Sequence, residues 1–268
     1  MINEIRDYYD SSVEYEWNRL NNPYSIIEFN STMHLIRKYF SGKGSILDIG
    51  SGPGRYSLSL LKMGYSVSLL DISLNELNFA RKNIEETGLK ADNYYHKSAL
   101  ELDEFGDNLY DGILIMGPMY HLHKKEERLK VLVNSYRILK KDGVAIISYI
   151  NTWGVLKASL SEFPESFVDI EHFDRYINGD LKFSKEESFT ETFFTTPVLA
   201  LEEVREGGFN ILSYAGAESY LSGLNMQMNN LKKEMPDAYE NYLQKAAEYC
   251  EYPQYRDATE HLHIVVKK

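Results

Sequence analysis

The sequence predicts an α/β fold in which a mostly parallel sheet carries helices on both faces. Three observations support this class. Strand patterns alternate with helix patterns between residues 45 and 150, with five strand patterns in all. A turn with three glycines at alternate positions separates the first strand pattern from the first helix pattern. The strand pattern at 112–116 is an apolar run, which is typical of a strand buried on both faces. Such alternation favours parallel strands joined by right-handed helical connections.

The elements follow in chain order from local patterns. Apolar spacing predicts two N-terminal helices, broken at Asn22-Pro23 and lying over residues 5–17 and 26–40. The next stretch predicts strands at 45–49, 65–70, 93–97, 112–116 and 144–150, and helices at 56–63, 74–87 and 129–139. Ser73 and Glu76 match the two ends of a capping box, which indicates a helix start after the second strand.

After residue 150 the alternation stops. Residues 151–195 carry many aromatic side chains without a clear period, so we expect a partly helical cap there that contributes to an acceptor pocket. Regular structure returns with a helix that begins at Thr196-Pro197, strands at 209–215 and 261–266, and helical patterns between them. The predicted organisation is therefore a helical lid at 1–43, an α/β core at 44–150 and a cap at 151–195. Residues 196–268 form the C-terminal part of the core, with a helical insertion at about 219–250.

The composition narrows the classes of function. The chain has 268 residues, a formal net charge of −11 and a single cysteine, Cys250. Nucleic-acid binding rests on clustered Lys and Arg, so the charge argues against a nucleic-acid partner. One cysteine permits no intrachain disulfide, and no apolar stretch is long enough for a membrane helix. We expect a soluble cytoplasmic protein without a membrane partner, and the sequence does not fix its oligomeric state.

The glycine turn is the strongest ligand signal. The run DIGSGPG at residues 48–54 ends the first strand in an acid and then places glycines at 50, 52 and 54. Dinucleotide-binding turns need their third glycine one position later, where this chain has Arg55. A carboxylate at Asp48 would repel a pyrophosphate but can hold an ammonium group, directly or through water. The glycines are also expected to bring bare backbone amides against a ligand at the N-terminus of the following helix. The turn therefore favours a nucleoside-linked ligand that carries a cationic amine.

Residues 46–56 resemble motif I of class I S-adenosylmethionine (SAM) methyltransferases. The resemblance implies a Rossmann-like seven-stranded sheet of order 3-2-1-4-5-7-6 with the last strand antiparallel. It also implies SAM as cofactor and S-adenosylhomocysteine as product. By this resemblance the cofactor would be held along its length by Asp48, Gly50, Ser51, Gly52, Gly54, Asp71, Ile72, Ser98 and Ala99. Asp71, at the end of the second strand, can accept both ribose hydroxyls. Ser98 departs from the family, in which an acid is common at that position.

A second motif, GPMYHL at residues 117–122, follows the fourth strand. It resembles the Gly-Pro-x-Tyr-His-Leu motif of a bacterial subgroup of these enzymes that acts mostly on small molecules. Ligands bind beyond the carboxyl ends of parallel strands, so Gly117, Tyr120 and His121 are expected near the methyl group. His121 can take a proton from the acceptor or can simply anchor the loop. Methyl transfer can also proceed by alignment alone, without a protein base.

Several residues are candidates for the acceptor side. Tyr9, Tyr15 and Arg19 on the first helix can close over the cofactor, and Arg19 can reach its carboxylate, although plain amphipathic packing explains them equally well. Tyr149, Asn151 and Trp153 follow the fifth strand and can line a pocket or pack the cap.

No metal is expected, because the ends of strands four and five lack the acids that metal-dependent relatives use. The sequence therefore predicts a SAM-dependent methyltransferase acting on a small organic acceptor. The alternatives are a non-catalytic SAM-binding regulatory protein, or a methyltransferase acting on a protein or RNA.

Overall fold

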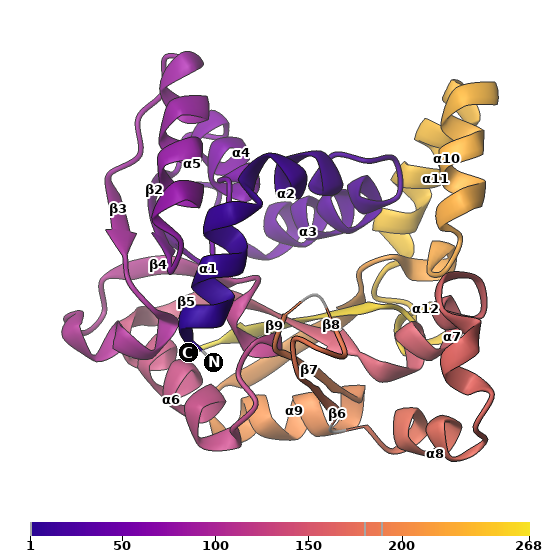
Figure 1. Ribbon diagram of the computed structural model, residues 1–268. Coiled ribbons are helices and arrows are strands. Elements are labelled where there is room, and N and C mark those ends of the chain that lie inside the picture. Colours follow the sequence, from indigo (N-terminus) through magenta and orange to yellow (C-terminus); the bar gives the residue numbers. More distant parts are fainter. Residues whose placement is uncertain (1, 180, 189) are drawn as a thin grey trace.

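The structure is a computed structural model that describes residues 2–179, 181–188 and 190–268. Met1, Asp180 and Phe189, which fall within the predicted lid and cap, lie outside the described residues. The centre is one mixed sheet (Figure 1). Its described strands are β1 (Ser45–Ile49), β2 (Ser66–Asp71), β3 (Asn93–His96), β4 (Tyr110–Ile115), β5 (Leu139–Asn151), β6 (Leu181–Phe183), β7 (Thr192–Thr195), β8 (Asn210–Gly216) and β9 (His261–Lys267).

The strand order confirms the predicted fold class, with one addition. Strands β3, β2, β1, β4 and β5 lie side by side and parallel. Strand β9 runs antiparallel to β5, and β8 runs antiparallel to β9, so these seven strands have the predicted order. The two extra strands form a hairpin, β6–β7, at the end of β5. Ile150 pairs with His261 of β9 and with Phe194 of β7, so the hairpin continues the sheet beyond the end of β4.

Helices cover both faces of the sheet. Their bounds are α1 (Ile2–Ser11), α2 (Val13–Leu20), α3 (Ser25–Tyr39), α4 (Arg55–Lys62), α5 (Leu74–Glu86), α6 (Lys125–Ile138), α7 (Thr152–Glu162), α8 (Glu171–Asn178), α9 (Pro197–Glu206), α10 (Asn225–Glu234), α11 (Pro236–Tyr249) and α12 (Pro253–Arg256). Short 3₁₀ turns are η1 (Ala99–Glu104), η2 (Pro118–Tyr120), η3 (Pro164–Phe167) and η4 (Ser219–Leu221). Apolar residues of α6 and α9 pack on one face, and those of α3, α4 and α5 on the other. In the described part of the chain, none of these helices combines the length and apolar composition that a membrane crossing requires.

The structure adds detail to one prediction about the helices and corrects another. The partly helical cap at 151–195 contains α7, α8 and the β6–β7 hairpin. The bounds of its helices were not evident from the sequence, because the apolar side chain of Leu160 on α7 faces solvent and α8 has only eight residues. The predicted helix over 5–17 is two helices, because the backbone leaves the helical conformation at Ser12.

The N-terminal helices lie across the edge at which the parallel strands end. Figure 1 shows α1 and α2, in indigo, in front of the sheet, and residues of both helices line one cavity with the segments that follow β1, β2 and β4. Asp10 fixes α1 to the start of α5, because its Oδ1 accepts from Ser73 Oγ at 2.6 Å and from the Asn75 backbone N–H at 3.2 Å. This arrangement encloses the strand ends, where ligands bind in open α/β sheets.

Candidate functional site

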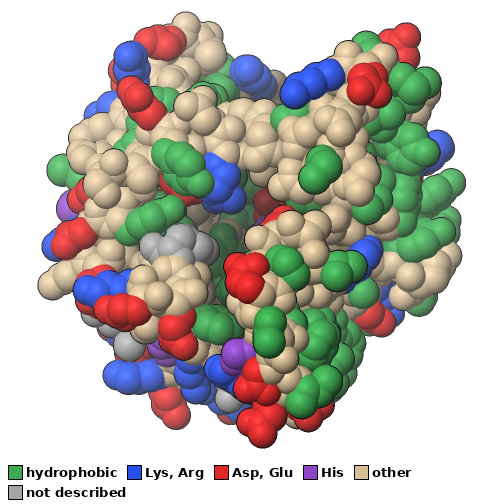
Figure 2. All heavy atoms as spheres, turned by 45° about the vertical axis from the view of Figure 1, so that its right-hand side comes forward, with side chains coloured by type: hydrophobic (Ala, Val, Ile, Leu, Met, Phe, Trp, Pro, Cys, Tyr) green, Lys and Arg blue, Asp and Glu red, His purple; other side chains and the backbone are tan. Residues whose placement is uncertain are grey.

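A cavity lies between the strand ends and the N-terminal helices. Its walls come from α1 and α2, from the glycine turn after β1, and from the segments that follow β2, β3 and β4. Glu28, Tyr56 and His261 complete it from α3, α4 and β9. The space between the walls, counted out to the open mouth, is about 1170 Å³, and Figure 2 shows the hollow near the middle of this face.

The glycine turn owes its shape to left-handed backbone conformations. The φ angles of Gly50, Gly52 and Gly54 are 72°, 49° and 78°, which glycine adopts readily. A Cβ on Gly50 would lie 2.6 Å from Pro118 Cδ, so only glycine lets the turn pack against the segment after β4. Without a Cβ at this position, the turns after β1 and β4 can meet at the base of the cavity.

The amides of this turn are not free for a ligand, contrary to the prediction. The backbone N–H groups of Gly50 and Ser51 donate to Leu70 O at 2.8 and 3.2 Å, and that of Gly54 donates to Ser51 O at 3.0 Å. The Gly52 N–H donates to Asp71 Oδ2 at 2.7 Å. These bonds close the turn onto the end of β2. A ligand in the cavity therefore meets side chains and carbonyl oxygens of the turn rather than bare amides.

Asp48 and Gly54 are parts of the turn that do not line the cavity. Asp48 is buried, and its Oδ2 accepts from Ser57 Oγ at 2.7 Å, which ties β1 to α4. Burial raises the pKa of this carboxyl to about 7. A Cβ on Gly54 would lie 2.8 Å from Ala80 Cβ, so this glycine serves the contact between α4 and α5. Direct contact of either residue with a ligand is therefore not part of this arrangement.

One wall of the cavity contains the residues expected at the adenosine. Asp71 lines the cavity together with Ile72, Ser98 and Ala99. Its Oδ1 accepts from the Ser73 N–H at 2.9 Å, while its Oδ2 takes the Gly52 N–H described above. Burial raises the pKa of this carboxyl despite these bonds. Each oxygen already has one partner and keeps a second lone pair for a ligand hydroxyl.

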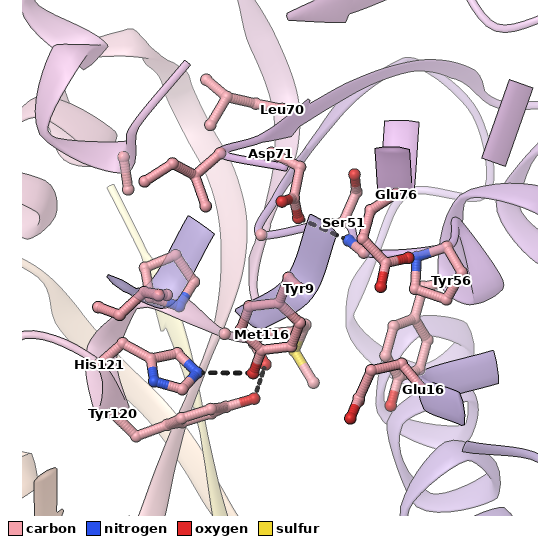
Figure 3. Close-up of a pocket in the computed structure, with 18 of the residues that line it drawn as sticks. Tyr9, Glu16, Ser51, Tyr56, Leu70, Asp71, Glu76, Met116, Tyr120 and His121 are labelled. Carbon is pink, nitrogen blue, oxygen red and sulfur yellow. Dashed lines mark hydrogen bonds between the residues drawn. The ribbon is translucent and has the colours of Figure 1, made fainter. Parts of the chain in front are cut away.

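The opposite wall holds Gly117, Tyr120 and His121, and Figure 3 shows the two aromatic side chains beside Tyr9. The Tyr120 hydroxyl donates to Met116 O at 2.6 Å. His121 Nδ1 lies 2.9 Å from Glu191 O, and its Nε2 lies 2.9 Å from the Tyr9 hydroxyl. A carbonyl only accepts, so Nδ1 carries the hydrogen and Nε2 accepts from Tyr9. Burial lowers the pKa of His121 to about 4, and the ring is therefore neutral.

The structure places only some of the candidates for the acceptor side in the cavity wall. Tyr9 and Arg19 line the cavity, and Arg19 Nε and Nη2 donate to Glu16 Oε2 at 3.0 and 2.7 Å. Tyr15 does not line it, because its side chain lies on the outer face of α2 and is 63% exposed.

Three further candidates require a correction, since β5 runs on to Asn151 and turns directly into α7. The Tyr149 hydroxyl is buried and donates to Glu203 Oε1 at 3.0 Å. The Asn151 side chain accepts from the Trp153 N–H at 3.1 Å and so caps α7. Trp153 Nε1 donates to Ile177 O at 2.9 Å. Asn151 and Trp153 thus hold α7 and α8 in place, Tyr149 bonds to α9, and none of the three lines the cavity.

The sequence did not point to six charged residues of the cavity, which are Glu16, Glu28, Arg55, Glu76, Lys97 and His261. Arg55 follows the glycine turn directly, so its place was open to prediction. Within the described part of the chain, its Nη1 is buried without a hydrogen-bond partner. His261 Nδ1 lies 2.6 Å from Glu218 Oε1. The nearby carboxylates of Glu28 and Glu218 outweigh burial and raise the pKa of His261 to about 10, so this ring is cationic.

The described residues contain no group of three or more His, Cys, Asp or Glu side chains placed to hold a metal ion. The polar atoms of the cavity thus come from scattered acids, two arginines, histidines and tyrosines. Such a mixture suits an organic ligand that bears both charges.

Comparisons with known proteins agree with this geometry. Residues 46–143, which contain β1–β4 and the glycine turn, match a family model described as a methyltransferase domain. The ubiquinone biosynthesis O-methyltransferase of Rickettsia conorii is 31% identical over 109 residues, which are 41% of this chain and 36% of that enzyme. This chain therefore spans only about a third of that relative's length. The tRNA 5-carboxymethoxyuridine methyltransferase of Escherichia coli is 21% identical over 225 residues, 83% of this chain and 79% of that enzyme.

Among solved structures, a 1,6-didemethyltoxoflavin-N1-methyltransferase from Burkholderia thailandensis is similar with a TM-score of 0.59 and 16% identity. The match covers 98% of this chain and 87% of that chain, which holds 1,6-didemethyltoxoflavin and S-adenosylhomocysteine. The fold of this protein is thus the Rossmann-like methyltransferase fold, and the match to the methyltransferase family model covers residues 46–143. The acceptors named for these relatives differ from one another.

Proposed function

We propose that this protein is a SAM-dependent methyltransferase that methylates a small organic acceptor, mainly by holding it in place. One observation carries the proposal. The acidic end of β2 and the Tyr120–His121 segment after β4 face each other across one cavity, which helices α1 and α2 cover. A covered cavity favours a small acceptor over an RNA or protein chain, and so does the net charge of −11. The net charge also favours an enzyme without a nucleic-acid partner, and we propose that the enzyme is cytoplasmic and has no membrane partner.

The residues of the cavity fit SAM. Asp71 retains lone pairs for the ribose hydroxyls, and Ile72, Ser98 and Ala99 lie beside it for the adenine. The buried Nη1 of Arg55 lacks a partner within the described residues, so it suits the carboxylate of the methionyl group. When bound, SAM supplies an electrophilic methyl group on a sulfonium.

The side chains near the acceptor position groups rather than transfer protons. Both ring nitrogens of His121 are engaged, and a pKa of about 4 makes the ring a weak base at neutral pH. Burial raises the pKa of Tyr120 and of Tyr9, so both remain protonated hydroxyls. Holding two reactants in line can account for a large part of a rate enhancement, and α1 and α2 cover the cavity in which they would be held.

The test is direct. Isothermal titration calorimetry should show binding of SAM and S-adenosylhomocysteine, and incubation with methyl-labelled SAM and a small-metabolite extract should yield a labelled small molecule by mass spectrometry. A label that appears only in protein or RNA would replace the small acceptor with a macromolecule. Binding without any transfer would favour the regulatory alternative. Absence of binding would refute the proposal as a whole.

A further inference from the structure

The capping box predicted at the start of α5 is only half formed. Ser73 Oγ accepts from the Glu76 N–H at 3.1 Å, as the motif requires. The reciprocal bond is missing, because the Ser73 N–H donates to Asp71 Oδ1 at 2.9 Å and not to the Glu76 side chain. Asp71 has taken the place of Glu76 in the cap. The Glu76 carboxyl group is therefore free of the role that its sequence position suggests.

This carboxyl group faces the cavity and has no partner in the part of the chain that the structure describes. Glu76 is 1% exposed and lines the cavity beside Asp71 and Ser51, as Figure 3 shows. Neither of its oxygens has a hydrogen-bond partner among the described residues. Buried polar groups in folded proteins are nearly always hydrogen-bonded, and an unpaired one is costly. A carboxyl group kept in this position calls for a partner that is not part of the chain.

The surroundings determine the protonation state of the Glu76 carboxyl. The charged groups that act on it are Asp71, Glu16, Asp10 and Arg19, and three of these four are acidic. Burial, followed by Asp71, raises the pKa of Glu76 to about 9. The group is then a neutral acid at pH 7, with one O–H donor and one carbonyl acceptor. Asp71, in contrast, offers only acceptor lone pairs.

We infer that Glu76 is a further cofactor-binding residue, which holds the ribose of SAM together with Asp71. A vicinal diol has two O–H donors and spare oxygen lone pairs. Asp71 accepts from the hydroxyls, and Glu76 donates to one of their oxygens, so the pair matches both halves of the diol's hydrogen-bonding capacity. The inference rests on the proposed function, since it takes SAM as the ligand of this cavity.

Two substitutions of similar size separate this role from a structural one. Glu76→Gln keeps a donor and an acceptor at the same length, and Glu76→Leu removes both. With S-adenosylhomocysteine as the probe in calorimetry, we expect Glu76→Gln to bind within about threefold of the wild type. We expect Glu76→Leu to bind about tenfold to a hundredfold more weakly, the loss of one or two hydrogen bonds. The ligand-free Glu76→Leu protein should unfold at or above the wild-type temperature, because it buries no unpaired carboxyl.

The contact with the ribose is tested by a double-mutant cycle. Analogues of S-adenosylhomocysteine that lack the 2′- or the 3′-hydroxyl should bind the wild type more weakly than S-adenosylhomocysteine does. On Glu76→Leu, one of the two analogues should bind as well as S-adenosylhomocysteine itself, because the contact that it lacks is already gone. If both losses are the same in the wild type and in Glu76→Leu, Glu76 does not contact the diol. If Glu76→Leu binds S-adenosylhomocysteine as tightly as the wild type, the inference falls while the proposed function stands. If the wild type does not bind it at all, both fall.

Discussion

The unpaired carboxyl of Glu76 predicts an unusual dependence of stability on pH. The perturbation is Glu76→Gln in the ligand-free protein, which replaces a titrating group by a neutral one of the same size. The carboxyl has an ordinary pKa of 4.5 and a pKa of about 9 in the folded protein. Between these values the unfolded chain has lost the proton and the folded protein retains it. The folded state therefore binds more protons, and the stability of the wild type falls as the pH rises from about 4.5 to about 9.

The magnitude follows from the two pKa values. At pH 7 the medium is about 2.5 units above the ordinary pKa of 4.5, and each unit corresponds to about 1.36 kcal/mol. The cost of keeping Glu76 protonated is then about 3 kcal/mol, an upper bound because water that enters the empty cavity hydrates the carboxyl in part. Glutamine has no such cost. The variant should equal the wild type in stability at pH 4 and exceed it by up to about 3 kcal/mol at pH 7.

Urea unfolding at pH 4, 5.5, 7 and 8.5 measures this difference directly. Glu85→Gln is the matched control, because Glu85 lies on the same helix but is exposed. This control should follow the wild type within about 0.5 kcal/mol at each pH. Asp48, whose pKa is also raised, is present in all three proteins and cancels in the comparison. A difference between Glu76→Gln and the wild type that stays constant with pH, or a variant less stable at pH 7, would refute the reasoning.

Three further outcomes are expected. Asp71→Ala removes the acceptor for the ribose hydroxyls and should weaken S-adenosylhomocysteine binding at least a hundredfold in calorimetry; unchanged affinity would contradict the site. Tyr9→Phe removes the hydrogen bond to His121 and should raise amide hydrogen exchange in α1, whereas equal exchange would show that this bond does not hold the helix. Arg128→Met leaves Glu203 without its buried partner, which lies 2.8 Å away, and should cost about 3–5 kcal/mol in urea unfolding; adding Glu203→Leu should restore most of this loss, and no restoration would argue against the ion pair.

Most of the fold was predictable because its patterns are local. The core strands are apolar runs, and the helices between them keep regular spacing, as in α5 with Leu77, Ala80 and Ile84 buried. The β6–β7 hairpin was not predictable, since its strands have three and four residues and show no period. A partly helical cap was expected around α7 and α8, but their bounds were not predictable, because Leu160 of α7 is exposed and α8 has only eight residues.

The residues of the candidate site were also predictable only in part. Asp71 and Tyr120 were found because Asp71 ends β2 and Tyr120 lies in the segment after β4, where the topology of the sheet places ligands. Glu28 and His261 were not found, because α3 and β9 bring them into the cavity from opposite ends of the chain. The role of the glycine turn was expected from its conformation, but the sequence could not show that Leu70 O takes two of its amides.

Glu76 shows why motif and structure can disagree in an informative way. The sequence motif offers two acceptors for one N–H of Ser73, since Asp71 and Glu76 can both reach the start of a helix. Asp71 is bonded to it, which also fixes the Asp71 carboxylate next to Gly52. The carboxyl displaced from the cap then faces the cavity, close to the unpaired hydroxyl of Ser51. Unsatisfied groups that cluster in one cavity lower the stability of the empty protein, and a ligand that supplies their partners gains the same free energy on binding. Ligand affinity and the instability of the empty protein should therefore change together when Glu76 is replaced.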